Sequence, residues 1–265
     1  MLADYHIHSY LCKHATGEPA DYAATAQQKQ LTEICFADHA PAPCGYDQKH
    51  RMGLDQFSEY TKFVTELRDN NNSAVLYGIE ADYYGNCEQF LKKWLPEQNF
   101  DLVIGSIHYI KEWGFDNPSE RKIWDSSDVT STWREYFRLV GQLADTGMYD
   151  IMAHIDLPKK FGHRPGDKNL KEMVQPALDK ISQAGMTIEI NTSGLRKPVK
   201  EIYPSPLLLE LAHEREISIC FGSDAHKPDE VGYCFDEALK LVKECGYTHY
   251  ARFRQREKEL IALPR

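Results

Sequence analysis

One segment, Asp4-Tyr5-His6-Ile7-His8-Ser9-Tyr10-Leu11-Cys12-Lys13-His14, carries three imidazoles directly after the start of an alternating apolar stretch. Residues 2–8 alternate as a β-strand does, and side chains two positions apart in a strand project from the same face. His6 and His8 are therefore expected to point to one place. Converging neutral imidazoles can bind a metal ion, but one packed and one solvated histidine would explain this pair equally well.

A second pair of this kind lies near the other end of the chain. Residues 217–222 predict a buried strand, which breaks into Ser223-Asp224-Ala225-His226. Asp224 and His226 thus place a carboxylate and an imidazole two positions apart at a strand end. This second pair favours the metal-site interpretation of the first.

Between the two pairs, short apolar runs alternate with amphipathic segments, which is the pattern of βα units around a parallel sheet. The expected strands are residues 2–8, 33–37, 75–79, 101–107, 150–153, 187–190 and 217–222. The expected helices are residues 18–30, 54–70, 88–95, 132–145, 171–184, 205–215 and 230–244, with Asn70-Asn71-Asn72 ending the second of them. Residues 109–129 predict a long excursion over one rim, and residues 247–265 receive no assignment.

Composition limits the classes of protein. A chain of 265 residues with 42% hydrophobic residues can bury a full core, and we expect residues 1–265 to form a single α/β domain. The formal net charge is −9 and the basic residues are scattered, which disfavours nucleic acid as a partner. We expect no membrane partner and a cytoplasmic location, because no apolar segment could span a bilayer and the first residues do not resemble a secretion signal.

The number and spacing of the cysteines also limit the classes of protein. The seven cysteines include no C-x-x-C and no regular spacing, which disfavours a disulfide framework and a zinc knuckle. Cys12 and Cys44 are interpreted as incidental loop thiols, although both could lie near a metal site.

The positions of the ionisable residues carry most of the functional information. At or just past the ends of six of the seven expected strands stand His6 and His8, His39, Glu80, His108, His154, and Asp224 and His226. In a parallel barrel those ends share one face, where active sites are built. Any one residue could be a core histidine or a rim charge, but buried imidazoles and carboxylates in such number require partners or metal ions.

These motifs resemble those of the polymerase and histidinol phosphatase superfamily. The matching features are His6-Ile7-His8, Asp38-His39, Glu80, Ser106-Ile107-His108, His154 and Asp224-Ala225-His226. Residues 156–163 and 191–198 are similar to loops of its histidinol-phosphatase branch. The resemblance implies a distorted parallel (β/α)7 barrel, TIM-like in plan, which agrees with the seven expected strands.

The resemblance also implies a cofactor of three divalent metal ions, for which zinc, iron and manganese are all suitable. The implied ligand sets are His6, His8, Glu80 and Asp224; then Glu80, His108 and His154; then His14, His39 and His226. Glu80 would bridge two ions. Such a cluster lowers the pKa of a bridging water, which becomes the hydroxide nucleophile, and it clamps phosphoryl oxygens.

The implied reaction is hydrolysis of L-histidinol phosphate to L-histidinol and inorganic phosphate, a step of histidine biosynthesis. Arg196 and Lys160 are the candidates for contacts to the remaining phosphate oxygens. The acid that protonates the leaving group stays open among Asp38, Asp156 and His163. We expect the excursion between Trp113 and Trp124 to recognise the amine and ring of this small phosphate monoester, through its aromatic and acidic residues Glu112, Asp116, Glu120 and Asp125.

Three other functions stay possible at this point. A sibling phosphoesterase could act on nucleotides or other small phosphate monoesters, and a substrate panel would separate it. A metal-bound barrel could serve only as a binding module, but a site without catalytic function would be expected to have lost at least one ligand. An amidohydrolase also begins with an H-x-H motif, but it usually relies on a carboxylated lysine or another ligand order, and no lysine stands at an expected strand end. The oligomeric state is not assigned.

Overall fold

The computed structural model describes residues 1–70 and 74–265, and its central feature is a seven-stranded parallel sheet. The strands follow the order β1 (Ala3–Ile7), β2 (Glu33–Phe36), β3 (Ala74–Asp82), β4 (Leu102–Ser106), β7 (Ile151–Met152), β8 (Thr187–Asn191) and β9 (Ile219–Gly222). Every neighbouring pair is parallel. The seven predicted strands are therefore confirmed, in sequence order around the sheet.

The sheet closes on itself just beyond the ends of its first and last strands. The amide of His8 donates to the carbonyl of Ala225 at 2.9 Å, and the amide of Ala225 donates to the carbonyl of His6 at 3.2 Å. These bonds form a parallel bridge between Ile7 and Ala225. The molecule is thus a nearly closed, distorted (β/α)7 barrel, as predicted, and the seam of the barrel runs through both histidine motifs.

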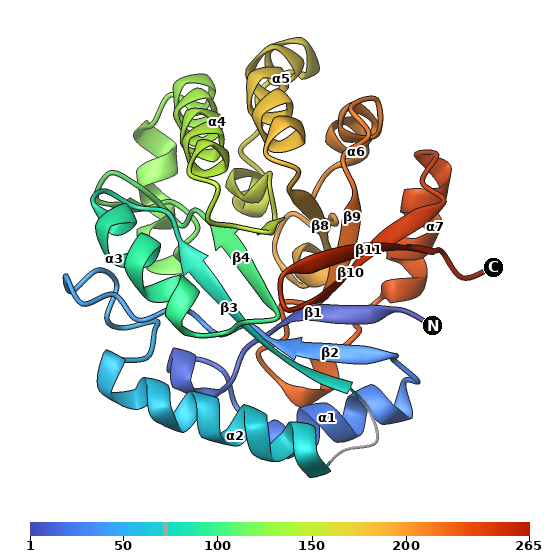
Figure 1. Ribbon diagram of the computed structural model, residues 1–265. Coiled ribbons are helices and arrows are strands. Elements are labelled where there is room, and N and C mark those ends of the chain that lie inside the picture. The colour runs from blue at the N-terminus through green and yellow to red at the C-terminus, as the bar shows by residue number, and fades with distance from the viewer. Residues whose placement is uncertain (71–73) are drawn as a thin grey trace.

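Helices surround the barrel, with one between most pairs of strands (Figure 1). They are α1 (Pro19–Gln28), α2 (Phe57–Asn70), α3 (Cys87–Trp94), α4 (Val129–Asp145), α5 (Asp167–Gln183), α6 (Pro206–His213) and α7 (Phe235–Glu244). Local sequence explains where they begin: Pro19 opens α1 inside a capping box, and the Asp128 side chain accepts the amide of Ser131 at the start of α4. The predicted end of the second helix lies partly at residues 71–72, outside the described residues.

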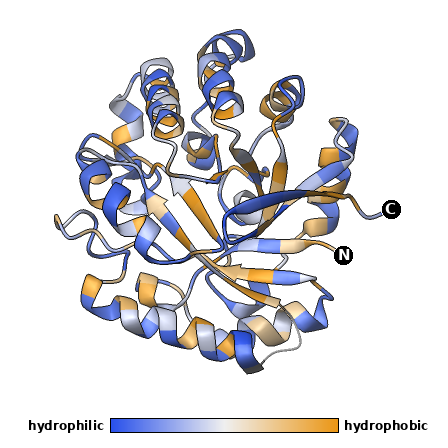
Figure 2. Ribbon diagram, in the orientation of Figure 1, coloured by the Kyte–Doolittle hydropathy of each residue, from blue (hydrophilic) through white to orange (hydrophobic). Residues whose placement is uncertain are grey.

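Two buried apolar clusters follow the two-residue period of the strands. In β2, Ile34 and Phe36 pack in one cluster with Tyr22 and Tyr60 of the surrounding helices. Cys35 belongs to the second cluster, which joins the barrel interior to α7 and the end of the chain. Figure 2 shows the result, with apolar strands inside and hydrophilic stretches on the outer helices. Burial on both faces is what a parallel sheet requires.

The unassigned segment after residue 247 forms an antiparallel hairpin of β10 (His249–Arg254) and β11 (Glu257–Ala262). Arg252 and Arg254 both donate to the buried carboxylate of Glu33, the first residue of β2. Arg256 pairs with Asp150 at 2.9 Å, directly before β7. The hairpin therefore covers the amino-terminal end of the barrel and leaves the carboxyl-terminal end open.

The predicted excursion between β4 and α4 contains a small hairpin of β5 (Tyr109–Ile110) and β6 (Trp113–Gly114), followed by the 3₁₀ helix η4 (Pro118–Ser126). Trp124 is only 2% exposed, and its indole N–H donates to the carbonyl of Phe115 at 2.7 Å. The Trp113 ring packs edge-on against Trp124. The two tryptophans thus anchor the excursion to the core. None of the helices in the described part of the chain combines the length and apolar character needed to cross a membrane.

Candidate metal centre

A cavity of about 380 Å³ opens at the carboxyl-terminal end of the barrel. The residues predicted there from the sequence that line it are His14, His39, Glu80, His108, His154, Lys160, Asp224 and His226. His6 and His8 lie fully buried at its base, within reach of Glu80. The structure therefore brings together all nine predicted metal ligands.

Glu80 occupies the middle of this group. Its Oε2 atom lies 2.9 Å from Nδ1 of His39, 3.3 Å from Nε2 of His6 and 3.5 Å from Nε2 of His8. Its Oε1 atom lies 3.4 Å from Nε2 of His154 and 3.7 Å from Nε2 of His108. Both oxygens are buried, yet neither accepts a hydrogen bond from any described residue. Ligands bound 2.0–2.2 Å from one tetrahedral ion stand about 3.3–3.6 Å apart, so this spacing suits shared metal ions.

The first predicted set is assembled on one side of Glu80. The Nε2 atoms of His6 and His8 are 3.1 Å apart, and Oδ1 of Asp224 lies 3.4 Å from Nε2 of His8. His6, His8 and Glu80 offer three donor atoms that all lie within 4.8 Å of one another. The other side of Glu80 faces His108 and His154, the remaining members of the second set.

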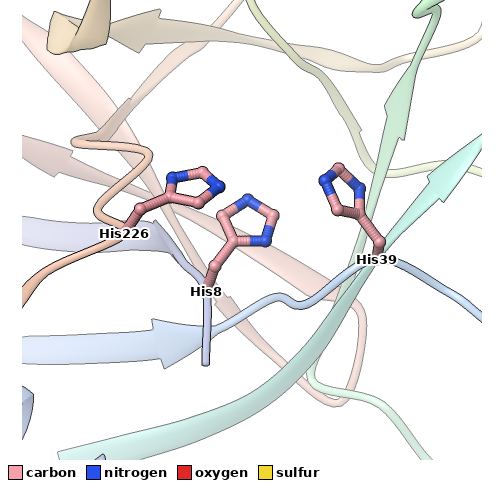
Figure 3. Close-up of side chains that lie close together, drawn as sticks. All are labelled: His8, His39 and His226. Atoms are coloured by element: carbon pink, nitrogen blue, oxygen red, sulfur yellow. The ribbon is translucent and has the colours of Figure 1, made fainter. Parts of the chain in front are cut away.

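The third predicted set, His14, His39 and His226, is brought together less tightly. His14 and His226 approach to 2.9 Å between their Nε2 atoms, whereas the rings of His14 and His39 are centred 5.8 Å apart. His39 and His226 instead form a donor group with His8, and the three rings lie side by side in Figure 3, from the segments after β2, β9 and β1. Cys12, treated as incidental at the sequence level, places its sulfur within 4.8 Å of donor atoms of His14 and His226.

The close pair of His14 and His226 tests whether a metal ion fits. Nδ1 of His14 lies 2.7 Å from the carbonyl oxygen of Cys12, and Nδ1 of His226 lies 3.0 Å from the carbonyl oxygen of Asp224. A carbonyl only accepts, so each Nδ1 must carry the hydrogen, and each neutral ring turns an unprotonated Nε2 toward the other. Two lone pairs at 2.9 Å repel unless a cation lies between or beside them. The donor set therefore fits a divalent metal.

Two buried carboxylates that the sequence analysis missed fix other rings in the same way. Oε1 of Glu189 lies 2.7 Å from Nδ1 of His6, and Oδ2 of Asp82 lies 3.0 Å from Nδ1 of His108. Each leaves Nε2 free to face Glu80. Both were detectable in principle, because Glu189 interrupts a buried apolar strand and Asp82 follows Glu80 on the same strand face.

Electrostatics agree with this arrangement. Burial alone would raise the pKa of Glu80, but the neighbouring His39 and His6 imidazoles hold it well below its usual range. Burial and the neighbouring His39 and His8 lower the pKa of His14 to about 4, and burial beside His8 lowers that of His226. Glu80 is thus an anion and the His14–His226 pair is neutral at neutral pH. These two charge states suit metal binding. In His6, His39 and His108, however, the adjacent carboxylates outweigh burial: they raise the pKa of His6 well above its usual value and those of His39 and His108 to about 9, so a bound ion has to displace protons from these three rings.

The backbone is strained where two of these side chains enter the site. His154 has φ of 23° and Asp224 has φ of 50°, both in the left-handed region. Such conformations cost roughly 1–3 kcal/mol each and persist only where the surroundings impose them. Here they turn the chain sharply at the ends of β7 and β9, so that each side chain faces Glu80 or His8.

The predicted phosphate contacts lie in different surroundings. Lys160 lines the cavity and pairs with Asp116 at 2.9 Å. Arg196 is not among the lining residues; its guanidinium donates to the carbonyls of Ser223 and Asp224 and lies 3.3 Å from Glu230. The adjacent Lys197, which the sequence analysis did not select, lines the cavity instead. Burial, offset in part by Asp224, lowers the pKa of Lys197.

The remaining sequence candidates do not line the cavity, although Asp38 lies 3.5 Å from Nδ1 of His8 at its base. Asp38 accepts the amides of Ser9 and His39. Asp156 accepts the amide of Ser205 and pairs with Lys159, and the His163 ring stacks on Trp124. None of the three proposed acids is a lining residue, and neither is Trp113 or Trp124. From the excursion, the cavity receives Tyr109, Asp116, Asn117 and Pro118.

Comparisons with known proteins identify the family and the fold. A family model described as the PHP domain matches residues 4–193, and one described as PHP-associated matches residues 207–238. A probable histidinol-phosphatase from Deinococcus radiodurans is 41% identical over 247 residues, which cover 92% of this chain and 94% of that protein. A histidinol-phosphatase from Bacillus subtilis is 26% identical, with 89% of this chain and 98% of that protein covered.

Among solved structures, a histidinol phosphate phosphatase from Lactococcus lactis, complexed with zinc, L-histidinol and phosphate, superimposes with a TM-score of 0.82. It shares 21% identity, and the match covers 97% of this chain and 98% of that one. At this identity the likeness establishes the barrel fold.

Proposed function

The chain belongs to the PHP domain family, and from that membership we propose that it hydrolyses L-histidinol phosphate to L-histidinol and inorganic phosphate. The relative from Deinococcus radiodurans, 41% identical and named a probable histidinol-phosphatase, supports the substrate. The observation that carries the chemistry is the Glu80 carboxylate, buried without a hydrogen-bond partner among the described residues and surrounded by imidazoles. Such a site suits a metal-dependent phosphomonoesterase of histidine biosynthesis.

About three divalent ions per chain form part of this proposal, because the predicted sets each supply three or four ligands and leave room for substrate. Zinc is supported by the zinc-containing Lactococcus lactis structure, with iron and manganese as alternatives. When bound, the ions would lower the pKa of a coordinated water and neutralise phosphoryl oxygens. We also propose that residues 1–265 act as one domain, since β1 and β9 close a single barrel.

The chain's own residues divide the remaining work. Glu80 holds the two halves of the site at a fixed separation, and Glu189 and Asp82 orient the rings that face it. Lys160 and Lys197 offer ammonium groups to phosphate oxygens at the cavity wall. Arg196 holds the Ser223–Asp224 turn through its carbonyls, and so positions Asp224. The cytoplasmic location and the absence of nucleic-acid and membrane partners stay predictions.

A substrate panel tests the reaction. We expect kcat/KM for L-histidinol phosphate to exceed that for nucleoside monophosphates, sugar phosphates and simple alkyl phosphates by at least about 100-fold, because a site built for polar groups rejects analogues that lack them. Preference for a nucleotide or sugar phosphate would instead favour the sibling phosphoesterase. No phosphate release from any of them by fully metallated protein would refute the proposed chemistry.

Elemental analysis of the same protein tests the metal centre. A content of about three ions supports the three sets, and no more than one contradicts them. A content of two would single out the His14, His39 and His226 set as misassigned. Glu80→Gln keeps the shape but removes the negative charge, so it should lower metal occupancy and reduce kcat by orders of magnitude. A Glu80→Gln protein with a full metal complement and normal turnover would show that Glu80 is not a ligand.

A further inference from the structure

One carboxylate of the cavity wall has no role in the metal centre. Four carboxylates line the cavity, namely Asp47, Glu80, Asp116 and Asp224. Glu80 and Asp224 belong to the ligand sets, and Asp116 is neutralised by Lys160 at 2.9 Å. Asp47 remains, on the loop between β2 and α2, and it belongs to none of the predicted ligand sets.

Asp47 is held firmly by a phenol and an imidazole. Its Oδ1 atom accepts the phenol hydroxyl of Tyr109 at 3.0 Å and lies 2.7 Å from Nδ1 of His50. Its side chain is only 10% exposed. The phenol fixes the direction of the carboxylate without cancelling its charge. Asp47 therefore presents a pre-positioned negative charge to the cavity.

The nearby arginine does not cancel that charge either. Arg51 lies 2.9 Å from Oδ2 of Asp82 but 3.6 Å from Oδ2 of Asp47. The guanidinium therefore donates to Asp82, which also lies 3.0 Å from Nδ1 of His108, and stands beyond hydrogen-bonding distance of Asp47.

The rest of the cavity is suited to the opposite charge. Lys197 lines it, and the metal sets would add further positive charge around Glu80. A phosphate group is drawn to that part of the cavity. A substrate with a cationic group near its phosphate would then be oriented by Asp47, which is available to pair with it.

We propose that Asp47 is the specificity-determining counter-ion that binds the substrate's ammonium group, held in place by Tyr109 and His50. This inference rests on the proposed function, since L-histidinol phosphate carries one amine on the carbon next to its phosphate-bearing carbon. It replaces the expectation that the Trp113–Trp124 segment recognises the amine through its aromatic and acidic residues. Of the acidic residues predicted there, only Asp116 lines the cavity, and Asp116 already forms an ion pair with Lys160.

Paired substrates test the role directly. L-histidinol phosphate is compared with 3-(imidazol-4-yl)propyl phosphate, which lacks only the amine and the hydrogen-bonding it brings. In Asp47→Asn, we expect kcat/KM for the amine-bearing substrate to fall roughly 10- to 100-fold, the size of a lost charge-assisted contact, and kcat/KM for the analogue to stay within about threefold. Tyr109→Phe removes one of the groups that hold Asp47. It should also lower the ratio of kcat/KM for L-histidinol phosphate to kcat/KM for the analogue, but by less than Asp47→Asn does.

Metal content and the circular dichroism spectrum are measured for each variant. An unchanged ratio of the two kcat/KM values in Asp47→Asn would overturn the proposal, and so would an equal loss on both substrates. If Asp47→Asn does not fold, an unchanged ratio in Tyr109→Phe decides against it. Failure of the wild-type protein to hydrolyse L-histidinol phosphate while it hydrolyses other phosphate esters would refute the proposed function instead.

Discussion

Nδ1 of His6 lies 2.7 Å from Oε1 of Glu189, although the two residues stand 183 positions apart in the chain. The same carboxylate accepts the backbone amide of His154 at 3.0 Å and the side-chain amide of Asn191 at 2.9 Å. One buried side chain of β8 thereby positions ligands from two other strands. Sets of this kind fix the tautomer and the direction of a metal-binding imidazole.

Glu189→Gln should weaken metal binding by about 10- to 100-fold, because the amide keeps a similar shape but loses the charge that holds the His6 ring. Competition with a chelator of known affinity measures this loss, and thermal unfolding of the metal-free protein checks the fold. Unchanged affinity in a folded variant would show that Glu189 does not support the site.

Gly222→Ala should disrupt the same contact by steric overlap. A Cβ at this position would lie 1.9 Å from Oε1 of Glu189 and 2.9 Å from Cβ of His6. Overpacking of this kind costs roughly 1–3 kcal/mol, and here the displaced groups are those that orient a ligand. Denaturant unfolding and metal titration should both report it. Gly85→Ala is the matched control, since nothing lies within 4 Å of its Cβ; equal behaviour of the two variants would contradict the prediction.

Lys197→Met should lower kcat/KM by roughly 10- to 100-fold and weaken inhibition by inorganic phosphate, with metal content unchanged, because it removes only a cavity-facing charge. Lys168→Met, at an exposed position, is the control. Arg196→Met should differ from both, since Arg196 holds the Ser223 and Asp224 carbonyls, and it should lower metal occupancy as well. Normal phosphate inhibition in Lys197→Met would exclude Lys197 from the phosphate contacts.

Glu33→Gln should destabilise the barrel by about 1.5–3 kcal/mol at neutral pH, because the buried carboxylate loses its ionic partners Arg252 and Arg254. Burial would raise the pKa of Glu33, but Arg252 and Tyr5 outweigh it and lower the pKa from its usual 4.5. The stabilisation is therefore fully present above pH 4.5 and is lost as the pH falls through the folded-state pKa.

Urea unfolding of both proteins between pH 3 and 8 measures this contribution. The difference between wild type and Glu33→Gln should shrink in acid, while kcat stays the same because Glu33 lies at the end of the barrel away from the cavity. A difference independent of pH would show that the ion pairs are not its cause.

Local sequence patterns were sufficient to place the strand-end residues of the predicted metal centre together, whereas His14 and the division into three ligand sets came from the family resemblance. Two-residue periodicity fixed the strands, and a parallel barrel requires their ends to meet, so residues as distant as His8 and Asp224 could be placed together without any knowledge of contacts. The side chains that surround the predicted ligands and the substrate cavity were harder to infer. Glu189, Asp82 and Asp47 act through side-chain contacts between segments remote in sequence, and no periodicity reports such contacts.

Two segments show where pattern alone misleads. Trp113 and Trp124 stand among acidic residues, which favours a surface role, yet the Trp124 indole found a carbonyl partner in the core. The alternation of Arg252, Phe253 and Arg254 gave no clear assignment, because charged residues normally face solvent. The two arginines face inward because they pair with the buried carboxylate of Glu33, which lies more than two hundred positions earlier in the chain.

The seam between β1 and Ala225 links closure of the barrel to assembly of the first predicted metal set. His6 and His8 come from the first strand, while Asp224 and His226 follow the last one, and the bonds between His8 and Ala225 join them. The first metal set is complete only when the ring of strands has closed. Ion binding and closure are therefore thermodynamically linked, so that each raises the equilibrium constant of the other. An ion bound by this predicted set would therefore stabilise the closed barrel, and a chain with an open seam would lack the complete set.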